Sequence, residues 1–341
     1  MSIFRPLVDR LRGASRLGTG LALALVMAAS VGSTGCIKKT LAKGQIKSTR
    51  EGSAAFQTTA DFETARIAAS AGIAQFEGMH MLVPDDDNAY YLLIRGWASL
   101  AFAFVEDDLE NAILTGDEDQ IAYQRARAKS MYTRAVNYGL EWMEHKNAGV
   151  NDAIKHGSEK EIQDYVQKFD DADDADFLFW TGQAWMARAN VDKADIGGIG
   201  QVFVGRTFVE RAAQLKDDIE RGSAHVLLGS YYARTGFNTL GQESFDKSKA
   251  HFDKAMQING GKVLLGRVQF ARTYACRMKD DSPGRKASFE MYMKLLNEVL
   301  EADDPLPEAR LTNAIAKRKA RRYTSKKWID DVAREDCGWE L

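Results

Sequence analysis

The sequence predicts an all-α protein, and three observations support this fold class. Apolar residues recur at i, i+3, i+4 and i+7 in long segments such as 65–76 and 291–300, which is the spacing of one helix face. The chain has only five prolines, and four of them stand beside turn-forming residues: Pro84, Pro283, Pro305 and Pro307. No segment alternates apolar and polar residues as a half-buried strand does. We therefore expect helices joined by turns.

A repeated pattern of small and large residues predicts how these helices pair. In tetratricopeptide-like hairpins, a glycine in helix A lets helix B approach, and stacking buries the face that one hairpin leaves exposed. Candidate helix-A glycines are Gly96, Gly182, Gly229 and Gly266. Candidate helix-B triplets are Gly72–Phe76–Met79, Ala128–Tyr132–Ala135, Gly205–Val209–Ala212 and Ser248–Phe252–Ala255. The order of these matches predicts stacked helical hairpins of the tetratricopeptide type, an α-solenoid.

The first 35 residues have the composition of a signal peptide. A basic start is followed by an uncharged stretch from Leu17 to Ile37, whose apolar part is only Leu21 to Ala29. Small residues then precede Cys36, and this arrangement resembles the lipobox of bacterial lipoproteins. The resemblance implies cleavage before Cys36 and a covalent diacylglyceryl lipid on its sulfur. An uncleaved anchor helix is the alternative. Because Ile37 replaces a retention aspartate, we expect the outer membrane.

The expected organisation has four parts. Residues 1–35 are the lipoprotein signal peptide, and 36–52 are the lipidated N-terminus with a flexible tether. Residues 53–335 form the helical domain, and 336–341 are a C-terminal tail. The other two cysteines, Cys276 and Cys337, lie in the helical domain and the tail. A disulfide between them is one interpretation, but two free thiols are the simpler one.

Composition and motifs exclude several classes of function. The net charge of −2 becomes more negative when the basic residues 1–35 are removed, so no general attraction to nucleic acid is expected. Neither acidic run, 85–87 or 170–176, has the glycine of a calcium loop, and both are better explained as helix caps. The five histidines are scattered, and no nucleophile elbow, P-loop or dinucleotide fingerprint occurs. We expect no catalytic residue, no metal and no cofactor besides the lipid.

Aromatic residues in the predicted A helices are the best candidates for a ligand site. Apolar walls with a few polar tips suit hydrophobic molecules, although the same rings could simply fill the core of the stack. The candidates for a hydrophobic channel are Trp97, Phe104, Phe179, Trp180, Trp185, Tyr231 and Tyr232. A second feature is the basic segment 317–327. We interpret it as a solvated helix face, with contact to an anionic surface as the alternative.

Five segments carry a family resemblance: EGMHMLVPDDDNAYYLLIRGWASLAFAFVEDDLENA, AKSMYTRAVNYGLEW, DADFLFWTGQAWMARA, TFVERAAQL and LTNAIAKRKARRY. In this order they resemble the T component associated with TRAP transporters, the TatT family, over roughly residues 60 to 330. The resemblance implies a lipid-anchored periplasmic protein that docks a solute-binding P component and encloses a channel for hydrophobic small molecules. A trimer would fit the family. The alternative is a tetratricopeptide scaffold for outer-membrane or pilus assembly that binds peptides in an open groove.

Overall fold

A computed structural model describes residues 38–235 and 241–340, and the regular structure in these ranges is entirely helical. The all-α prediction is therefore confirmed. The main helices are α2 (Phe62–Leu82), α3 (Asp87–Leu100), α4 (Glu106–Thr115), α5 (Glu118–Lys146), α6 (Val150–His156), α7 (Glu159–Val166), α8 (Asp174–Val191), α9 (Ile196–Gly200), α10 (Val202–Leu215), α11 (Ser223–Thr235), α12 (Gly241–Asn259), α13 (Leu265–Phe270), α14 (Lys286–Glu301), α15 (Arg310–Tyr323), α16 (Lys326–Trp328) and α17 (Arg334–Cys337). In this part of the chain no helix is long and apolar enough to cross a membrane.

Short helices and π-helical segments connect or interrupt these elements. The short helices are η1 (Ser53–Thr58), η3 (Ile219–Gly222), η6 (Pro283–Arg285) and η7 (Pro307–Ala309). The π-helical segments are η2 (Ala101–Val105), η5 (Ala271–Ala275) and η8 (Ile329–Ala333). Segment η2 joins α3 to α4, and segment η5 directly follows α13. Each π-helical segment therefore interrupts a stretch that the sequence predicts to be one continuous A helix. Such π-helical turns are frequent at functional sites.

Aspartates begin several helices by capping free backbone N–H groups. Asp61 accepts from the Thr64 backbone N–H at 2.7 Å, and Asp86 accepts from Asn88 and Ala89 at 3.0 and 3.2 Å. The second acidic run differs from the prediction of a helix cap, because the N-cap residue of α8, Asp173, makes no side-chain cap hydrogen bond, and Asp171 instead accepts from the Asp173 backbone N–H at 2.9 Å in the turn before the helix. Capping of this kind satisfies donors that have no partner inside the helix. The acidic run 85–87 therefore contributes a cap to α3.

Glycines allow three of the predicted A helices to lie very close to a neighbour. A Cβ at Gly182 in α8 would come within 2.6 Å of the Gly205 carbonyl oxygen in α10, and one at Gly229 would meet the Phe252 ring at 2.9 Å. Gly96 similarly faces Ile73 of α2 at 2.9 Å, whereas a Cβ at Gly266 would make only an ordinary contact at 3.4 Å. The hairpins α8–α10 and α11–α12 thus pack as expected. The arrangement is repeat-like, and its assignment to the tetratricopeptide type stays a prediction.

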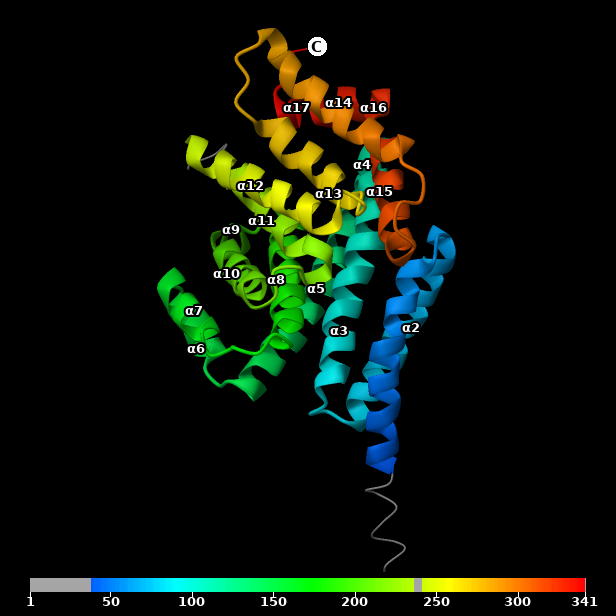
Figure 1. Ribbon diagram of the computed structural model, residues 1–341, viewed down its shortest axis with the longest axis vertical. Helices are drawn as coiled ribbons and strands as arrows, with labels where there is room; N and C mark the ends of the chain where they lie inside the picture. Colours follow the sequence, from blue (N-terminus) through cyan, green and yellow to red (C-terminus); the bar gives the residue numbers. More distant parts are fainter. Residues whose placement is uncertain (1–37, 236–240, 341) are drawn as a thin grey trace, which may run out of the picture.

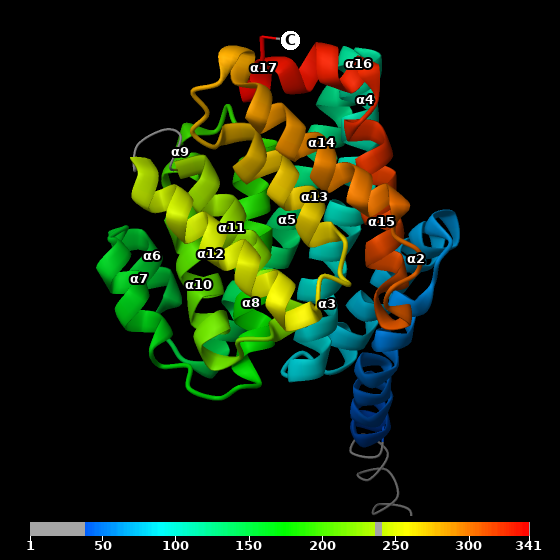
Figure 2. The same ribbon diagram turned by 45° about the horizontal axis from the view of Figure 1, so that its top comes forward.

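Successive hairpins curve until the late helices η7 and α15 contact the early helices η1 and α2. Figure 2 shows α12, α13, α14 and α15 following one another across one face, and Figure 1 shows α15 beside α2. Contacts between η1 and η7 and between α15 and η1 close the arrangement. Segments distant in the sequence therefore lie side by side. The two larger clusters of buried apolar residues extend from Ile46 to Leu228 and from Phe252 to Trp339.

Buried ion pairs join α4 to α15 at this closure. Lys319 Nζ lies 2.8 Å from Glu110 Oε1, Arg318 Nε lies 2.7 Å from Asp107 Oδ2, and Arg322 pairs with both carboxylates. Lys319 and Arg322 are only 2% and 7% exposed. This corrects the interpretation of the segment 317–327 as a solvated face, because three of its seven basic side chains pair with carboxylates of α4.

Both ends of the expected domain are more ordered than the sequence suggested. Residues 38–52, expected as a flexible tether, are helical, and Ile46 is 1% exposed in the core. The four-residue spacing of Ala42 and Ile46 gives this helix one apolar stripe that packs. At the other end Trp339, expected in a free tail, is 2% exposed and donates to Ser288 Oγ at 2.9 Å. Cys36 lies outside the described residues.

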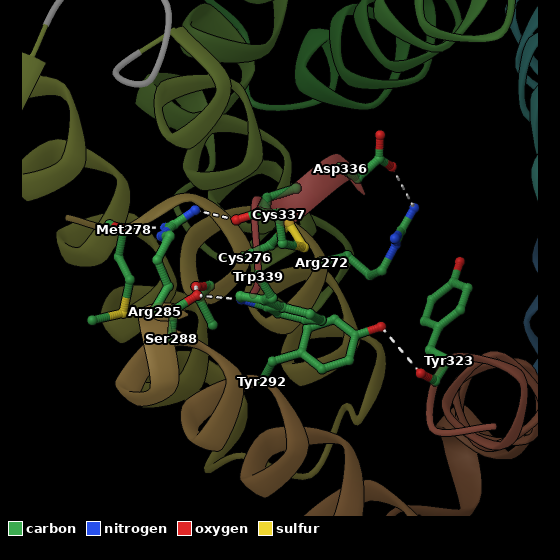
Figure 3. The surroundings of a disulfide bond; sticks show 12 residues. Arg272, Cys276, Met278, Arg285, Ser288, Tyr292, Tyr323, Asp336, Cys337 and Trp339 are labelled. Atoms are coloured by element: carbon green, nitrogen blue, oxygen red, sulfur yellow. Dashed lines mark hydrogen bonds and ion pairs between the residues drawn. A yellow bond between two sulfur atoms is a disulfide. The ribbon is translucent and has the colours of Figure 1, made fainter. Parts of the chain in front are cut away.

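A disulfide joins Cys276, after η5, to Cys337 at the end of α17 (Figure 3). The Cα atoms are 4.8 Å apart, within the range that the bond allows. The prediction of two free thiols is therefore wrong. It failed because the chain separation of 61 residues says nothing about distance in space. Burial of Trp339 against Phe289 and Tyr292 holds the chain end on α14, which packs against η5.

Candidate ligand cavity

A partly enclosed cavity of about 1590 Å³ lies inside the curved stack. Its walls are one face of each A helix, because lining residues recur every three or four positions, as Phe179, Gln183 and Ala187 do in α8. Early and late helices both contribute, through Gln57 in η1 and Leu311 in α15. The volume exceeds the range of about 300–1,000 Å³ that is common for small-molecule sites. The closure of the stack therefore creates room for an extended ligand.

Four of the seven predicted aromatic residues line this cavity: Phe104, Phe179, Trp180 and Tyr231. They come from η2, α8 and α11, so segments far apart in the sequence bring them to one space. Phe179 and Phe104 are nevertheless mostly buried, at 3% exposed each. These rings therefore form part of the wall and part of the core at once.

The other three predicted residues pack elsewhere. Trp97 donates to Glu77 Oε1 at 2.9 Å, beneath the guanidinium of Arg134. Trp185 donates to the Gln201 carbonyl at 3.0 Å and lies between α8 and α10. Tyr232 stacks on His251 and donates to Glu210 at 2.8 Å. Neighbouring positions on one helix point to different faces, which is why Trp180 and Tyr231 reach the cavity while Trp185 and Tyr232 do not.

A conformationally strained turn contributes two charged side chains to the cavity. Glu220 and Arg221 in η3 have φ values of 44° and 58°, followed by Gly222 at 86°. Left-handed conformation is unfavourable for residues other than glycine. Here it places the Glu220 carboxylate to accept from Trp180 Nε1 at 3.2 Å and to pair with Arg95 Nε at 3.5 Å. The turn thus fixes the orientation of one aromatic wall residue.

One side of the cavity carries the acidic residues of α4. Burial raises the pKa of Glu106, which accepts a hydrogen bond from the Tyr132 hydroxyl. Burial also opposes ionisation of Glu110, but Lys319 and Arg322 outweigh it and lower the pKa of that carboxyl. Glu110 is therefore ionised and pairs with the cations of α15, whereas Glu106 loses its proton less readily. Sequence reasoning missed these residues. The signal that could have found them is the opposite charge of two segments, the acidic run 106–110 and the basic run 318–322.

Another side of the cavity is basic. Lys193, Arg234, Arg272 and Arg277 all line it, and they come from the α8–α9 link, the end of α11, η5 and the turn after η5. Arg272 Nη2 lies 3.9 Å from Asp336 Oδ2, an interaction drawn in Figure 3. Sequence reasoning missed this group as well, because its members are isolated cations in four different segments.

Among the residues that the structure describes, no group of three or more histidine, cysteine, aspartate or glutamate side chains could hold a metal ion. The nearest histidine pair, His225 and His251, joins Nδ1 to Nδ1 at 2.9 Å, and Asp217 is 2.9 Å from His225 Nε2. What the cavity offers is a large apolar space with charges of both signs at separate places.

These features define a class: an all-α protein of repeat-like hairpins that closes around a large cavity. The family model for the TRAP transporter T-component matches residues 58–328. Because that match covers most of the chain, the protein belongs to the TRAP transporter T-component family and is associated with TRAP transport. The resemblance inferred from the five sequence segments is thus confirmed. Comparison with curated proteins finds no significant match.

Proposed function

We propose that this protein is a non-enzymatic periplasmic lipoprotein that docks the solute-binding P component of a TRAP transporter and holds a hydrophobic small molecule in its cavity. The observation that carries the proposal is the cavity of about 1590 Å³, whose walls include Phe179, Trp180 and Tyr231. Aromatic and aliphatic walls bind apolar molecules by removing their surface from water. Family membership supports the link to a TRAP transporter.

The alternative is a scaffold for outer-membrane or pilus assembly that binds peptide segments in an open groove. The contacts between η1 and η7 and the ion pairs between α4 and α15 count against it, since they join early and late helices beside the cavity. An extended peptide would need a continuous open concave surface, whereas this cavity is partly enclosed. We therefore favour a small molecule in the interior and a protein partner on the outside.

A capture experiment tests the docking half of the proposal. Residues 37–341, immobilised as soluble bait, are exposed to a periplasmic extract, and the retained proteins are identified by mass spectrometry. Recovery of a TRAP-type solute-binding protein is expected, and size-exclusion chromatography of the complex then tests whether the bait is the trimer that the family suggests. Recovery of assembly-machinery subunits without any solute-binding protein would favour the scaffold instead.

Membrane attachment is tested separately on the full-length chain. We propose that Cys36 carries the diacylglyceryl lipid and anchors the protein to the outer membrane. The Cys36→Ala variant should lose metabolic lipid labelling and accumulate as a precursor or a soluble form. The Cys276→Ala/Cys337→Ala variant is the matched control and should keep the label. An unchanged lipid signal on Cys36→Ala would contradict the anchor assignment.

A further inference from the structure

We propose that the helix of residues 38–52, here called the basic helix, binds the anionic surface of the membrane through its lysines. The partner is the layer of negatively charged phospholipid head groups, and the contact holds the protein in one orientation on the bilayer. The inference rests on the proposed function, because it adds an electrostatic contact to the lipid that we place on Cys36.

The basic helix differs in charge from the rest of the mature chain. No acidic residue occurs between positions 38 and 50, whereas five basic residues do: Lys38, Lys39, Lys43, Lys47 and Arg50. From residue 51 onward the balance is reversed, with 47 acidic and 37 basic residues. A negatively charged surface therefore attracts the basic helix and repels the remainder of the protein, which selects one orientation. Clusters of about four to eight basic residues beside a membrane anchor are typical of binding to anionic lipids.

The lysines of the basic helix are accessible from outside the molecule. All four are exposed, and Lys39, Lys43 and Lys47 recur every four residues, so they form one stripe along the helix. Lys47 lies 3.9 Å from Glu51, but these two side chains are 69% and 67% exposed, and an exposed pair of this kind is worth little. Within the part of the chain that the structure describes, no ion pair or hydrogen bond engages the side chains of Lys38, Lys39 and Lys43.

The basic helix follows the proposed lipid anchor almost directly. Only Ile37 separates Cys36 from Lys38 in the sequence. Two residues span at most about 7 Å even when they are fully extended. A diacylglyceryl group on Cys36 would therefore bring Lys38 and Lys39 within reach of the head groups. A protein partner, at least one helix thick at about 10 Å, does not fit into that gap, so we propose lipid as the partner of these lysines.

The shape of the molecule leaves this region open. Figures 1 and 2 show the beginning of the basic helix, in dark blue, projecting past the helices that pack around it. Leu41 lies in this projecting part and is 70% exposed. An apolar side chain among lysines is suited to the boundary between head groups and acyl chains, because it leaves water while the cations stay at the surface.

The later part of the basic helix is fixed to the body of the protein. Ile46 is buried, and the Arg50 guanidinium donates to Asp176 Oδ2 at 3.0 Å and to Asn88 Oδ1 at 3.2 Å. The same guanidinium lies 4.1 Å from the centre of the Tyr91 ring. The basic helix is therefore held on α3 and α8, so an orientation imposed on its lysines is passed to the whole protein.

This arrangement connects the membrane contact with the cavity. Thr49 and Gly52, in the later part of the basic helix, line the cavity. A rise of 1.5 Å per residue places Thr49 about 16 Å along the helix from Lys38. The lysines would therefore hold this wall of the cavity a short and constant distance from the bilayer, where apolar molecules are concentrated.

Vesicle co-sedimentation tests the inference with the mature protein made without its lipid, residues 37–341. The vesicles consist of phosphatidylcholine alone or of phosphatidylcholine with about 30% phosphatidylglycerol. The protein should bind the anionic vesicles at least tenfold more tightly than the neutral ones. About 0.5 M salt should remove the difference, because it screens exposed charges. Equal binding to both kinds of vesicle would overturn the inference.

A triple variant locates the contact on the basic helix. Lys38→Gln/Lys39→Gln/Lys43→Gln should weaken association with the anionic vesicles at least tenfold, because each lysine near such a surface contributes about fivefold. The replaced side chains are exposed, so the fold should not change, and circular dichroism checks this. Parent-like binding of this variant would overturn the inference.

The control removes the same charge from exposed positions elsewhere on the protein. Lys160→Gln/Lys279→Gln/Lys286→Gln replaces lysines that are 79%, 73% and 72% exposed, and it should bind the anionic vesicles as the parent does. If this control loses as much binding as the first variant, net charge is responsible and the assignment to the basic helix is wrong.

Two further outcomes separate this inference from the proposed function. If Cys36 carries the lipid label but the anionic vesicles are not preferred, the inference fails while the anchor stands. If Cys36 carries no label, the proposed lipoprotein fails whatever the vesicles show. Should the triple variant bind vesicles normally but no longer capture a solute-binding protein, the basic helix docks that protein and the inference is overturned.

Discussion

The lysine that joins α15 to α4 allows a quantitative test of how the stack closes. Lys319 is 2% exposed, and its Nζ lies 2.8 Å from Glu110 Oε1. The Lys319→Met variant keeps an unbranched apolar stem but removes the terminal ammonium group and its charge. Breaking a buried ion pair by removing one partner costs about 3–5 kcal/mol. Because Glu110 keeps Arg322 and the Tyr323 hydroxyl as partners, we expect the lower end, about 3 kcal/mol of unfolding free energy.

Urea unfolding followed by circular dichroism at 222 nm measures this cost. With a slope of about 3 kcal/mol per molar urea, the midpoint should fall by about 1 M. The control is Lys327→Met, whose pair with Asp331 at 2.9 Å is more than half exposed on both sides. Exposed pairs are worth about 0–1 kcal/mol, so its midpoint should hardly move. Equal midpoints for Lys319→Met and the parent protein would refute the view that this pair holds the closure together.

Three further predictions concern other parts of the structure. After denaturation without reductant, Cys276 and Cys337 should both resist alkylation, and their double serine variant should lose about 4 kcal/mol of stability; ready alkylation would refute the disulfide. Burial, followed by repulsion from His225, lowers the pKa of His251 to about 4. Between pH 6.5 and pH 4 the unfolded state therefore binds a proton at this residue that the folded state does not. The free energy of unfolding should decrease as the pH falls through this range, by roughly 2 kcal/mol after allowance for partial exposure. His251→Gln should lack this loss, and an identical pH profile would refute the assignment. Gly182→Ala should destabilise by about 1–3 kcal/mol because its Cβ would meet a backbone oxygen at 2.6 Å, whereas Gly78→Ala, with nothing within 4 Å, should be neutral or stabilising; equal effects would contradict the close α8–α10 packing.

Local patterns were sufficient to predict the helices and much of their pairing. Two helices of one hairpin follow each other in the sequence, and their close packing requires apolar periodicity and small residues such as Gly182, Gly205 and Gly229. These features can therefore be recognised in a short stretch of sequence. The failure at Gly266 shows the limit of that argument. A glycine in a helical pattern signals a close approach only where another helix comes near.

The closure and the site could not be predicted, because they depend on residues that lie far apart in the chain. The pairing of Lys319 with Glu110 joins segments separated by 209 residues. Taken alone, each of these charged residues would be predicted to lie on the surface. The same holds for the cysteines and for Arg234 and Arg272, which become neighbours only after the hairpins curve. Aromatic residues posed a different problem, since a ring that lines a cavity and a ring that fills a core need the same helical spacing.

The most direct test of the central claim is whether an apolar molecule occupies the cavity. Binding of the neutral probe N-phenyl-1-naphthylamine is followed by its fluorescence with the parent protein, with Ala187→Trp and with Ala122→Trp. Ala187 lines the cavity on α8, whereas Ala122 is exposed on α5 outside it. We predict saturable one-to-one binding to the parent and to Ala122→Trp, and binding at least tenfold weaker to Ala187→Trp. Absence of saturable binding to the parent, or equal affinity in all three proteins, would contradict the assignment of this cavity as the ligand site.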